Sequence, residues 1–489
     1  MKDFVKKNYY SILIWGLIIG FTILYFSLIF NINVTTDEIY SLNLFKMGPK
    51  GMIDATRQDI HPPLYYLYGY LFELISPQNI HLQKVASIIP TVGAMALVAT
   101  VLRKRIGDLS AFLTLLFFAC VPCTMEYAVQ LRMYSLSMFF VTLCGIFCYT
   151  AYTENRVLDW IFVGIGFAGA AYTVYFALVA VCFEVGILFL FIVFNLKKRQ
   201  GRLKNFIICA VLSILAYSPW IPVFIEQTTR VRGDYYLPPI TWETIWGFFT
   251  WTFDLEIVSG FVYLFIAALM AIAIIGIVHT SKNKDDRGLI IVAFMSMLIP
   301  TLTTLAGVIV SLSQDPIYEG RYVIIEMMML AIFFGVILGK VLEGCGSEIV
   351  KRVVIAVTVA VLIFTGAVQY YECFRQEYRN HLTQETIDYF AEHLGPNDYV
   401  LYNYESMGFD YKFYFPNDRL FYVRDFDFEN TNYENIWFLS NLYEWPITDA
   451  DCYTYWISYE YIGTYGVEDN NFDLYRYYHN DFPKIEVTE

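Results

Sequence analysis

The feature that most constrains this chain is its set of long apolar runs. One of them, residues 160–195, holds 36 residues with Glu184 as its single charged side chain. A helix rises ~1.5 Å per residue and the hydrocarbon core of a bilayer is about 30 Å thick, so one crossing needs only about 20 residues. The run therefore predicts two membrane-spanning helices that turn near residues 172–175.

Further windows have the length and apolar character of a single crossing. The window nearest the N-terminus, residues 9–30, should stay attached as a helix and is not a cleaved signal peptide. Its apolar stretch is too long, and no small-residue cleavage site follows it. Composition agrees, since 57% of the residues are hydrophobic and 16% are charged, against about 25% charged in a soluble domain. We therefore expect about eleven spans, the remaining windows being residues 9–30, 85–102, 109–125, 133–151, 205–225, 257–280, 288–312, 322–340 and 353–371.

The charges are segregated along the chain. Residues 372–489 carry 7 Lys+Arg and 23 Asp+Glu, which leaves 26 and 23 for residues 1–371. With eleven spans, 18 basic residues fall on the side of the N-terminus and 8 on the other, as the positive-inside rule requires. This predicts a plasma-membrane protein with a cytoplasmic N-terminus and an extracytoplasmic acidic tail. A nucleic-acid binder would need a concentrated basic face, so that class is excluded.

Two domains are expected from this organisation, a membrane domain over residues 1–371 and an extracytoplasmic domain over 372–489. Residues 31–84 form one long outer loop, and long loops tend to carry function. Within it, Leu64–Ile75 is apolar but only 12 residues long and follows two prolines. If it crossed the membrane, the basic residues 103–105 would face outward, so we expect an interfacial or re-entrant helix.

The acidic tail has the pattern of a small α/β domain. Residues 381–394 resemble a helix that closes at a Gly-Pro pair, and four segments rich in Tyr, Phe and Val predict strands at 398–403, 419–423, 436–441 and 472–479. Its aromatic residues are more typical of a core than of a glycan-binding surface.

Two polar clusters stand in the outer loop. Asp37 and Glu38 follow a Thr-Thr pair directly after the first span; they either cap a helix or hold a general base at the membrane surface. Asp59 and His61 precede the two prolines and Tyr65. His61 is either a polar cap of the short helix or a site residue.

Two more clusters fall on the same side of the membrane. Arg132 and Tyr134 lie at the outer end of the third and fourth spans, and Arg321 and Tyr322 open the tenth. An interfacial arginine often only snorkels to the headgroups. Helix capping and snorkelling do not explain why four polar clusters converge on one face, so we expect a site there.

The ordered set of motifs resembles a known family. DE-x-Y-S, D-x-H-P-P-L-Y-Y, Q-x-R-M-Y, Y-T-x-Y-F and G-R-Y follow one another along residues 1–371. This order is similar to that of bacterial relatives of protein O-mannosyltransferases and lipid A aminoarabinose transferases, which are GT-C polyprenyl-phosphate-sugar glycosyltransferases. Val174 stands where many relatives have a histidine in the Y-T-x-Y turn, so we do not count that turn as catalytic.

The resemblance implies a fold and a reaction. The fold would be a polytopic α-helical GT-C domain with a small α/β domain at its C-terminus. Asp37 would take the proton of an acceptor hydroxyl during an inverting displacement, and Glu38 and His61 would orient it or the acceptor. Further residues are expected to bind the substrates: Arg132 and Arg321 the lipid phosphate, with Lys84 a third candidate, and Asp59, Tyr65, Tyr134 and Tyr322 the remaining surface of the cavity.

The partners follow from the same resemblance. The donor would be a polyprenyl-phosphate sugar and the acceptor a lipid, a glycan or a protein. No metal is required, because arginines can neutralise one phosphate; a divalent cation between Asp37, Glu38, Asp59 and His61 remains an alternative, although their spacing fits no known metal pattern. A polytopic transporter or lipid-linked glycan flippase is the competing function, which the lack of an internal repeat disfavours.

Overall fold

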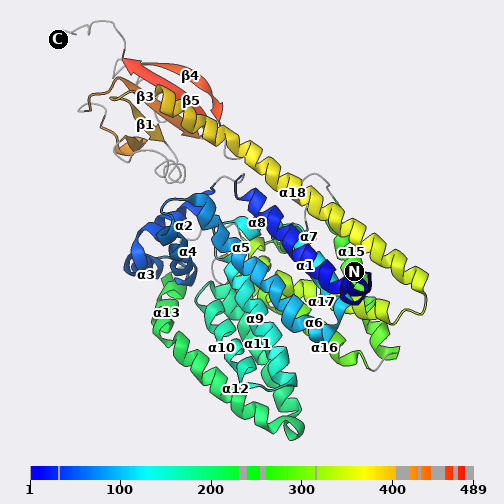
Figure 1. Ribbon diagram of the computed structural model, residues 1–489. Coiled ribbons are helices and arrows are strands. Elements are labelled where there is room, and N and C mark those ends of the chain that lie inside the picture. The colour runs from blue at the N-terminus through cyan, green and yellow to red at the C-terminus, as the bar shows by residue number, and fades with distance from the viewer. Residues whose placement is uncertain are drawn as a thin grey trace, which may run out of the picture. The chain divides into compact units, whose positions relative to one another are not determined.

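The computed structural model describes residues 2–30, 34–230, 239–253, 260–282, 285–313, 316–402, 419–427, 431–441, 457–465 and 472–479. The chain divides into two compact units. The first comprises Met1–Phe30 and Ser41–Cys373 and is helical, and the second comprises Asn31–Tyr40 and Phe374–Glu489 and contains a β-sheet (Figure 1).

The first unit is built from long apolar helices. In the described part of the chain, eight helices are long and apolar enough to cross a membrane, and three further apolar helices are shorter. This confirms the expected polytopic helical architecture, while the number of crossings stays a prediction. The helices are α1 (Lys2–Leu28), α5 (Ile80–Leu97), α7 (Asp108–Cys120), α9 (Tyr134–Thr153), α10 (Val157–Ala171), α11 (Tyr175–Phe194), α12 (Leu196–Tyr217), α15 (Phe261–Lys282), α16 (Arg287–Ser313), α17 (Met327–Glu343) and α18 (Glu348–His393).

The long run at 160–195 forms two helices as predicted. Helix α10 ends at Ala171 and α11 begins at Tyr175, so the turn lies at the expected place. Helices α9 and α10 pack closely because glycines face α9. A Cβ atom on Gly166 would lie 2.7 Å from the backbone nitrogen of Cys144, and one on Gly169 would overlap the ring of Phe140. Small residues permit this approach between helices in membranes.

We expect Gly166→Ala to destabilise the first unit. The added methyl would meet the backbone of α9, and overpacking of this kind costs about 1–3 kcal/mol. Gly186→Ala on α11 is the matched control, because a Cβ there has no atom within 4 Å. The measurement is the Tm of each purified variant in detergent. Equal Tm values for the two variants would contradict the close α9–α10 contact.

The segment that follows α1 folds into short helices. They are α2 (Thr36–Lys46), α3 (Gly48–Gln58) and α4 (Leu64–Ile75), and α4 occupies the residues predicted for the short helix. Figure 1 shows α3 and α4 beside α13. The other short helices are α6 (Arg103–Ile106), α8 (Thr124–Val129), α13 (Ile221–Arg230), α14 (Trp242–Trp251) and the 3-10 helices η2 (Ser218–Trp220) and η3 (Gly320–Glu326), and a π-helical turn, η1 (Val98–Leu102), follows α5.

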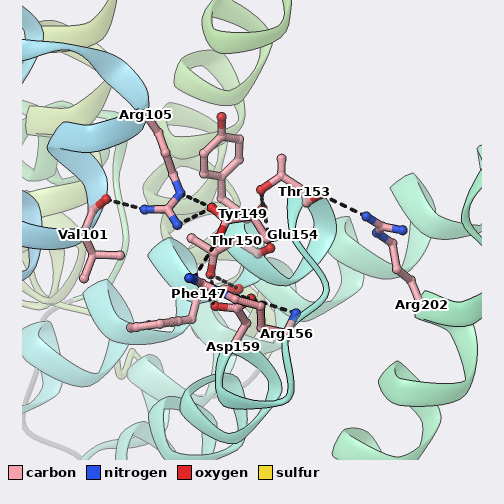
Figure 2. A network of polar contacts seen from close by, with 10 residues as sticks. All are labelled: Val101, Arg105, Phe147, Tyr149, Thr150, Thr153, Glu154, Arg156, Asp159 and Arg202. Atoms are coloured by element: carbon pink, nitrogen blue, oxygen red, sulfur yellow. Dashed lines mark hydrogen bonds and ion pairs between the residues drawn. The ribbon is translucent and has the colours of Figure 1, made fainter.

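The C-terminal end of α9, at Thr153, is held by ion pairs and hydrogen bonds, which Figure 2 shows. The Arg105 guanidinium donates from Nε to Glu154 Oε1 at 2.7 Å, and Arg156 Nη2 donates to Asp159 Oδ1 at 2.8 Å. Arg202 of α12 donates to two backbone carbonyls at the end of α9. The two Arg202 bonds satisfy carbonyls that a helix end leaves without intrahelical partners.

The sheet of the second unit has five strands in the order β2-β1-β3-β5-β4. β1 is parallel to β2 and β3, and the pairs β3–β5 and β5–β4 are antiparallel. Alternate residues of β1 and β3 enter two separate buried clusters, so both faces of the sheet are covered. The strands are β1 (Tyr399–Tyr402), β2 (Leu420–Tyr422), β3 (Asn435–Asn441), β4 (Ile457–Tyr465) and β5 (Phe472–His479).

Two sequence predictions differ from the structure in this part of the chain. The four expected strands are present, but β4 was not predicted. The last span, expected to end at residue 371, continues as α18 to His393, because residues 372–393 contain no glycine or proline to stop a helix. The expected separate helix at 381–394 is the end of α18.

Candidate active site

His61 and Arg132 meet inside the first unit, although 71 residues separate them. Arg132 Nη2 lies 3.5 Å from His61 Nε2, and the two side chains are 5% and 8% exposed. Arginine nitrogens only donate hydrogen bonds, so His61 Nε2 can take part in this contact only as the acceptor. The burial of Arg132 excludes the snorkelling alternative. The contact therefore joins the His61 imidazole to a buried guanidinium group.

Local sequence places both residues. Helix α3 ends at Gln58, and Asp59 follows in an extended conformation (ψ −166°). The two prolines then start α4, which fixes the backbone around His61. Arg132 lies in the turn between α8 and α9, where its amide donates to Gln130 O at 2.8 Å. The Ser87 hydroxyl of α5 donates to the same carbonyl at 2.5 Å.

Lys84 and Tyr65, two of the predicted site residues, are each 0% exposed. Lys84 lies on α5 one turn before Ser87, so both project from the helix face that meets the Gln130 turn. Tyr65 lies on α4, with its ring 6.1 Å from that of Phe45. Lys84 therefore carries an ammonium group inside the first unit, close in sequence to the Ser87 contact with the Arg132 turn.

An aromatic cluster connects the Arg132 turn to η3. The rings of Tyr134 and Tyr322 lie 6.3 Å apart, and those of Tyr127 and Tyr134 lie 5.2 Å apart. Arg321, next to Tyr322, forms an ion pair with Glu319. Burial raises the pKa of the Tyr127 phenol well above its usual value, and the positive charge of Arg321 opposes that rise. The two arginine-bearing segments thus share one cluster.

Asp37 and Glu38 lie in the first turn of α2, and Glu38 takes part in the N-terminal cap of this helix. The Thr35 amide donates to Glu38 Oε2 at 2.9 Å, and the Glu38 amide donates to Thr35 Oγ1 at 3.4 Å. This reciprocal pair is a capping box, so Thr35 and Glu38 account for the cap expected at this position. Residues 31–40 belong to the second compact unit, and the other predicted site residues belong to the first.

Glu319 pairs with Arg321 and Tyr127 packs against Tyr134, but neither was among the predicted site residues. Glu319 had a local signal, an acid two positions before an arginine with glycine between them. Tyr127 had no such signal, because its relation to Arg321 arises only from the fold.

Glu184, the single charge of the 160–195 run, lies elsewhere. It is 5% exposed and lines a cavity of about 440 Å³ between α9, α11 and α16. The cavity extends to Thr153, the end of α9 remote from Arg132. In the described part of the chain, no three His, Cys, Asp or Glu side chains are grouped as metal ligands.

Comparisons with known proteins agree with this architecture. The sequence model of a family described as dolichyl-phosphate-mannose-protein mannosyltransferase matches residues 60–225, about a third of the chain. That range includes His61, Tyr65, Lys84, Arg132 and Tyr134. No curated protein matches the sequence.

Two solved structures share the fold. The crystal structure of ArnT from Cupriavidus metallidurans in the apo state aligns with a TM-score of 0.57 at 11% identity, covering 96% of this chain and 98% of that one. ArnT from the same organism bound to undecaprenyl phosphate aligns with a TM-score of 0.52 at 12% identity and the same coverage. The resemblance and the GT-C fold class expected from the motifs are therefore confirmed, and the chain is a multi-pass membrane protein.

Proposed function

We propose that this protein is an integral-membrane glycosyltransferase that moves a sugar from a polyprenyl phosphate to an acceptor hydroxyl. The observation that carries the proposal is the buried contact between Arg132 and His61. A buried guanidinium group at one end of a bundle of membrane helices is suited to bind the phosphate group of a lipid. The ArnT structure with undecaprenyl phosphate supports the same kind of donor.

Three cations serve the donor phosphate in this proposal. When the sugar–phosphate bond breaks, the lipid phosphate gains a negative charge as it leaves. Arg132, Arg321 and Lys84 stabilise that developing charge, which lowers the barrier. Glu319 orients Arg321 through their ion pair, and Tyr134 and Tyr322 hold the two arginine segments together. In this proposal, the side of the substrate site next to α4 is lined by Asp59, His61 and Tyr65.

Asp37 is the general base of the proposed reaction. It accepts the proton of the acceptor hydroxyl while the oxygen attacks the anomeric carbon from the side opposite the phosphate, so the configuration inverts. Glu38 caps the helix that carries Asp37 and so fixes its position. The reaction balances without a metal ion, because the guanidinium groups take the charge of the single phosphate.

The proposed site faces away from the cytoplasm. The excess of basic residues on the N-terminal side supports a cytoplasmic N-terminus in the plasma membrane. In this orientation the domain over residues 372–489 is extracytoplasmic, and the acceptor is a lipid, a glycan or a protein.

The experiment uses the purified full-length protein in nanodiscs with polyprenyl-phosphate hexoses and pentoses. We expect release of polyprenyl phosphate that depends on an added hydroxyl acceptor. A transporter or flippase would move the intact lipid-linked sugar between leaflets and release no polyprenyl phosphate. Translocation of intact donor without cleavage would therefore replace this proposal with the competing function.

A further inference from the structure

The turn between α10 and α11 contains the Y-T-x-Y-F motif that sequence reasoning excluded from catalysis. Its backbone holds the start of α4, since the Leu64 amide donates to Tyr172 O at 3.0 Å. Leu64 lies three residues after His61. One side of the His61 segment is therefore fixed to this turn.

The other side of the segment is fixed by Gln227 of α13. This side chain is 1% exposed, and its Nε2 donates to Thr56 O at 2.7 Å and more weakly to Arg57 O at 3.4 Å. These carbonyls belong to the last turn of α3, where helix carbonyls lack intrahelical donors. Gln227 thus closes the end of α3 two residues before Asp59, although 171 residues separate it from Thr56.

Tyr175 of the motif orients Gln227. The Tyr175 hydroxyl donates to Gln227 Oε1 and accepts from Trp220 Nε1 at 3.2 Å. The bonds therefore run as one chain from Trp220 through Tyr175 and Gln227 to Thr56. A tyrosine hydroxyl that donates to the amide oxygen leaves the amide NH₂ group directed at α3.

Apolar packing surrounds this chain of bonds. Tyr175 lies 4.9 Å from Phe224 and Tyr172 lies 5.2 Å from Tyr217, measured between ring centroids. Ile53 of α3 packs against the same cluster. Such packing has no strict direction, whereas the hydrogen bonds set the register of α3 against α13.

We propose that Gln227 and Tyr175 are positioning residues that hold the Asp59–Leu64 segment so that His61 meets Arg132. The inference rests on the proposed function, because it gives His61 and Arg132 a role at the donor phosphate. Both ends of the segment are tied to α10–α13, and its middle meets Arg132. The motif acts through the backbone it supports, and this explains why it serves with Val174 in place of a histidine.

The first test is hydrogen exchange of the full-length protein in nanodiscs, which requires no activity. Gln227→Leu should increase exchange in the peptide covering residues 56–66, because the carbonyls at the end of α3 lose their donor. Tyr175→Phe is a milder variant that keeps the ring and should increase exchange in the same peptide. Tyr172→Phe is the control, since its hydroxyl donates to Ala216 O and the Tyr172 carbonyl remains. Unchanged exchange in both variants would overturn the anchoring.

The second test is kinetic. Gln227→Leu should lower kcat/KM by roughly tenfold to a hundredfold, as a displacement of about 1 Å does in an active site, and Tyr172→Phe should not. In a His61→Ala background, Gln227→Leu should have little further effect, because both changes remove the same contact. Additive losses, or increased exchange with unchanged kcat/KM, would overturn the positioning role. An inactive wild type would overturn the proposed function and leave the exchange result to decide the anchoring.

Discussion

Asp37→Asn is expected to lower the rate of sugar transfer by about 10²- to 10⁴-fold, the usual contribution of a positioned general base. Asparagine has the same size and shape but does not accept the proton of the attacking hydroxyl. Glu38 and Thr35 continue to cap α2 in this variant, so the helix that carries residue 37 is retained. The measurement is single-turnover release of polyprenyl phosphate with donor and acceptor both saturating.

The control for this prediction is Asp54→Asn. Asp54 is an exposed acid on α3 whose ion pair with Arg57 spans 4.0 Å, a contact of little energetic value at the surface. The Asp54→Asn variant should transfer sugar at the wild-type rate. Donor binding should also be unchanged in Asp37→Asn, because the proposed role of Asp37 is to take the proton of the acceptor. A wild-type transfer rate in Asp37→Asn would remove it as the base.

Local patterns were enough to predict the elements around the site. The prolines and the apolar length of residues 64–75 gave α4 its correct ends, and the doubled length of the 160–195 run gave the α10–α11 turn. These features depend on residues within one element, so periodicity and breakers determine them. The same logic missed the continuation of α18, because a charge change suggested a domain boundary where the helix has no breaker.

Contacts between distant segments could not be predicted in the same way. The meeting of His61 with Arg132 and of Gln227 with Thr56 depends on how α3, α9 and α13 pack. The motifs indicated that polar clusters share a face of the membrane, but not which pairs touch. Gln227 carried no signal at all, since an amide near the end of an apolar helix is typical of a membrane boundary.

Arg132→Ala is expected to weaken binding of polyprenyl phosphate by roughly 10- to 150-fold, since a hydrogen bond to a charged group contributes about 1.5–3 kcal/mol. The transfer rate at saturating donor should fall further, because the developing phosphate charge loses a fixed donor; losses of about 10²- to 10³-fold are usual for one such group. Arg132→Lys should lie between wild type and alanine, since lysine keeps the charge but not the two-point geometry. The measurements are equilibrium binding of polyprenyl phosphate and single-turnover transfer.

Arg57→Ala separates local loss of a phosphate ligand from a general loss of positive charge. Arg57 is 57% exposed on α3, so its removal changes the net charge as much as Arg132→Ala does without emptying a buried site. Arg132→Ala leaves His61 without its cationic neighbour, so the Tm of the variant must be measured with and without polyprenyl phosphate. A stabilisation by ligand that matches the wild type would show that the phosphate binds elsewhere. In that case the His61–Arg132 contact supports the fold of the α4 segment, and the donor site must be built around Arg321 and Lys84.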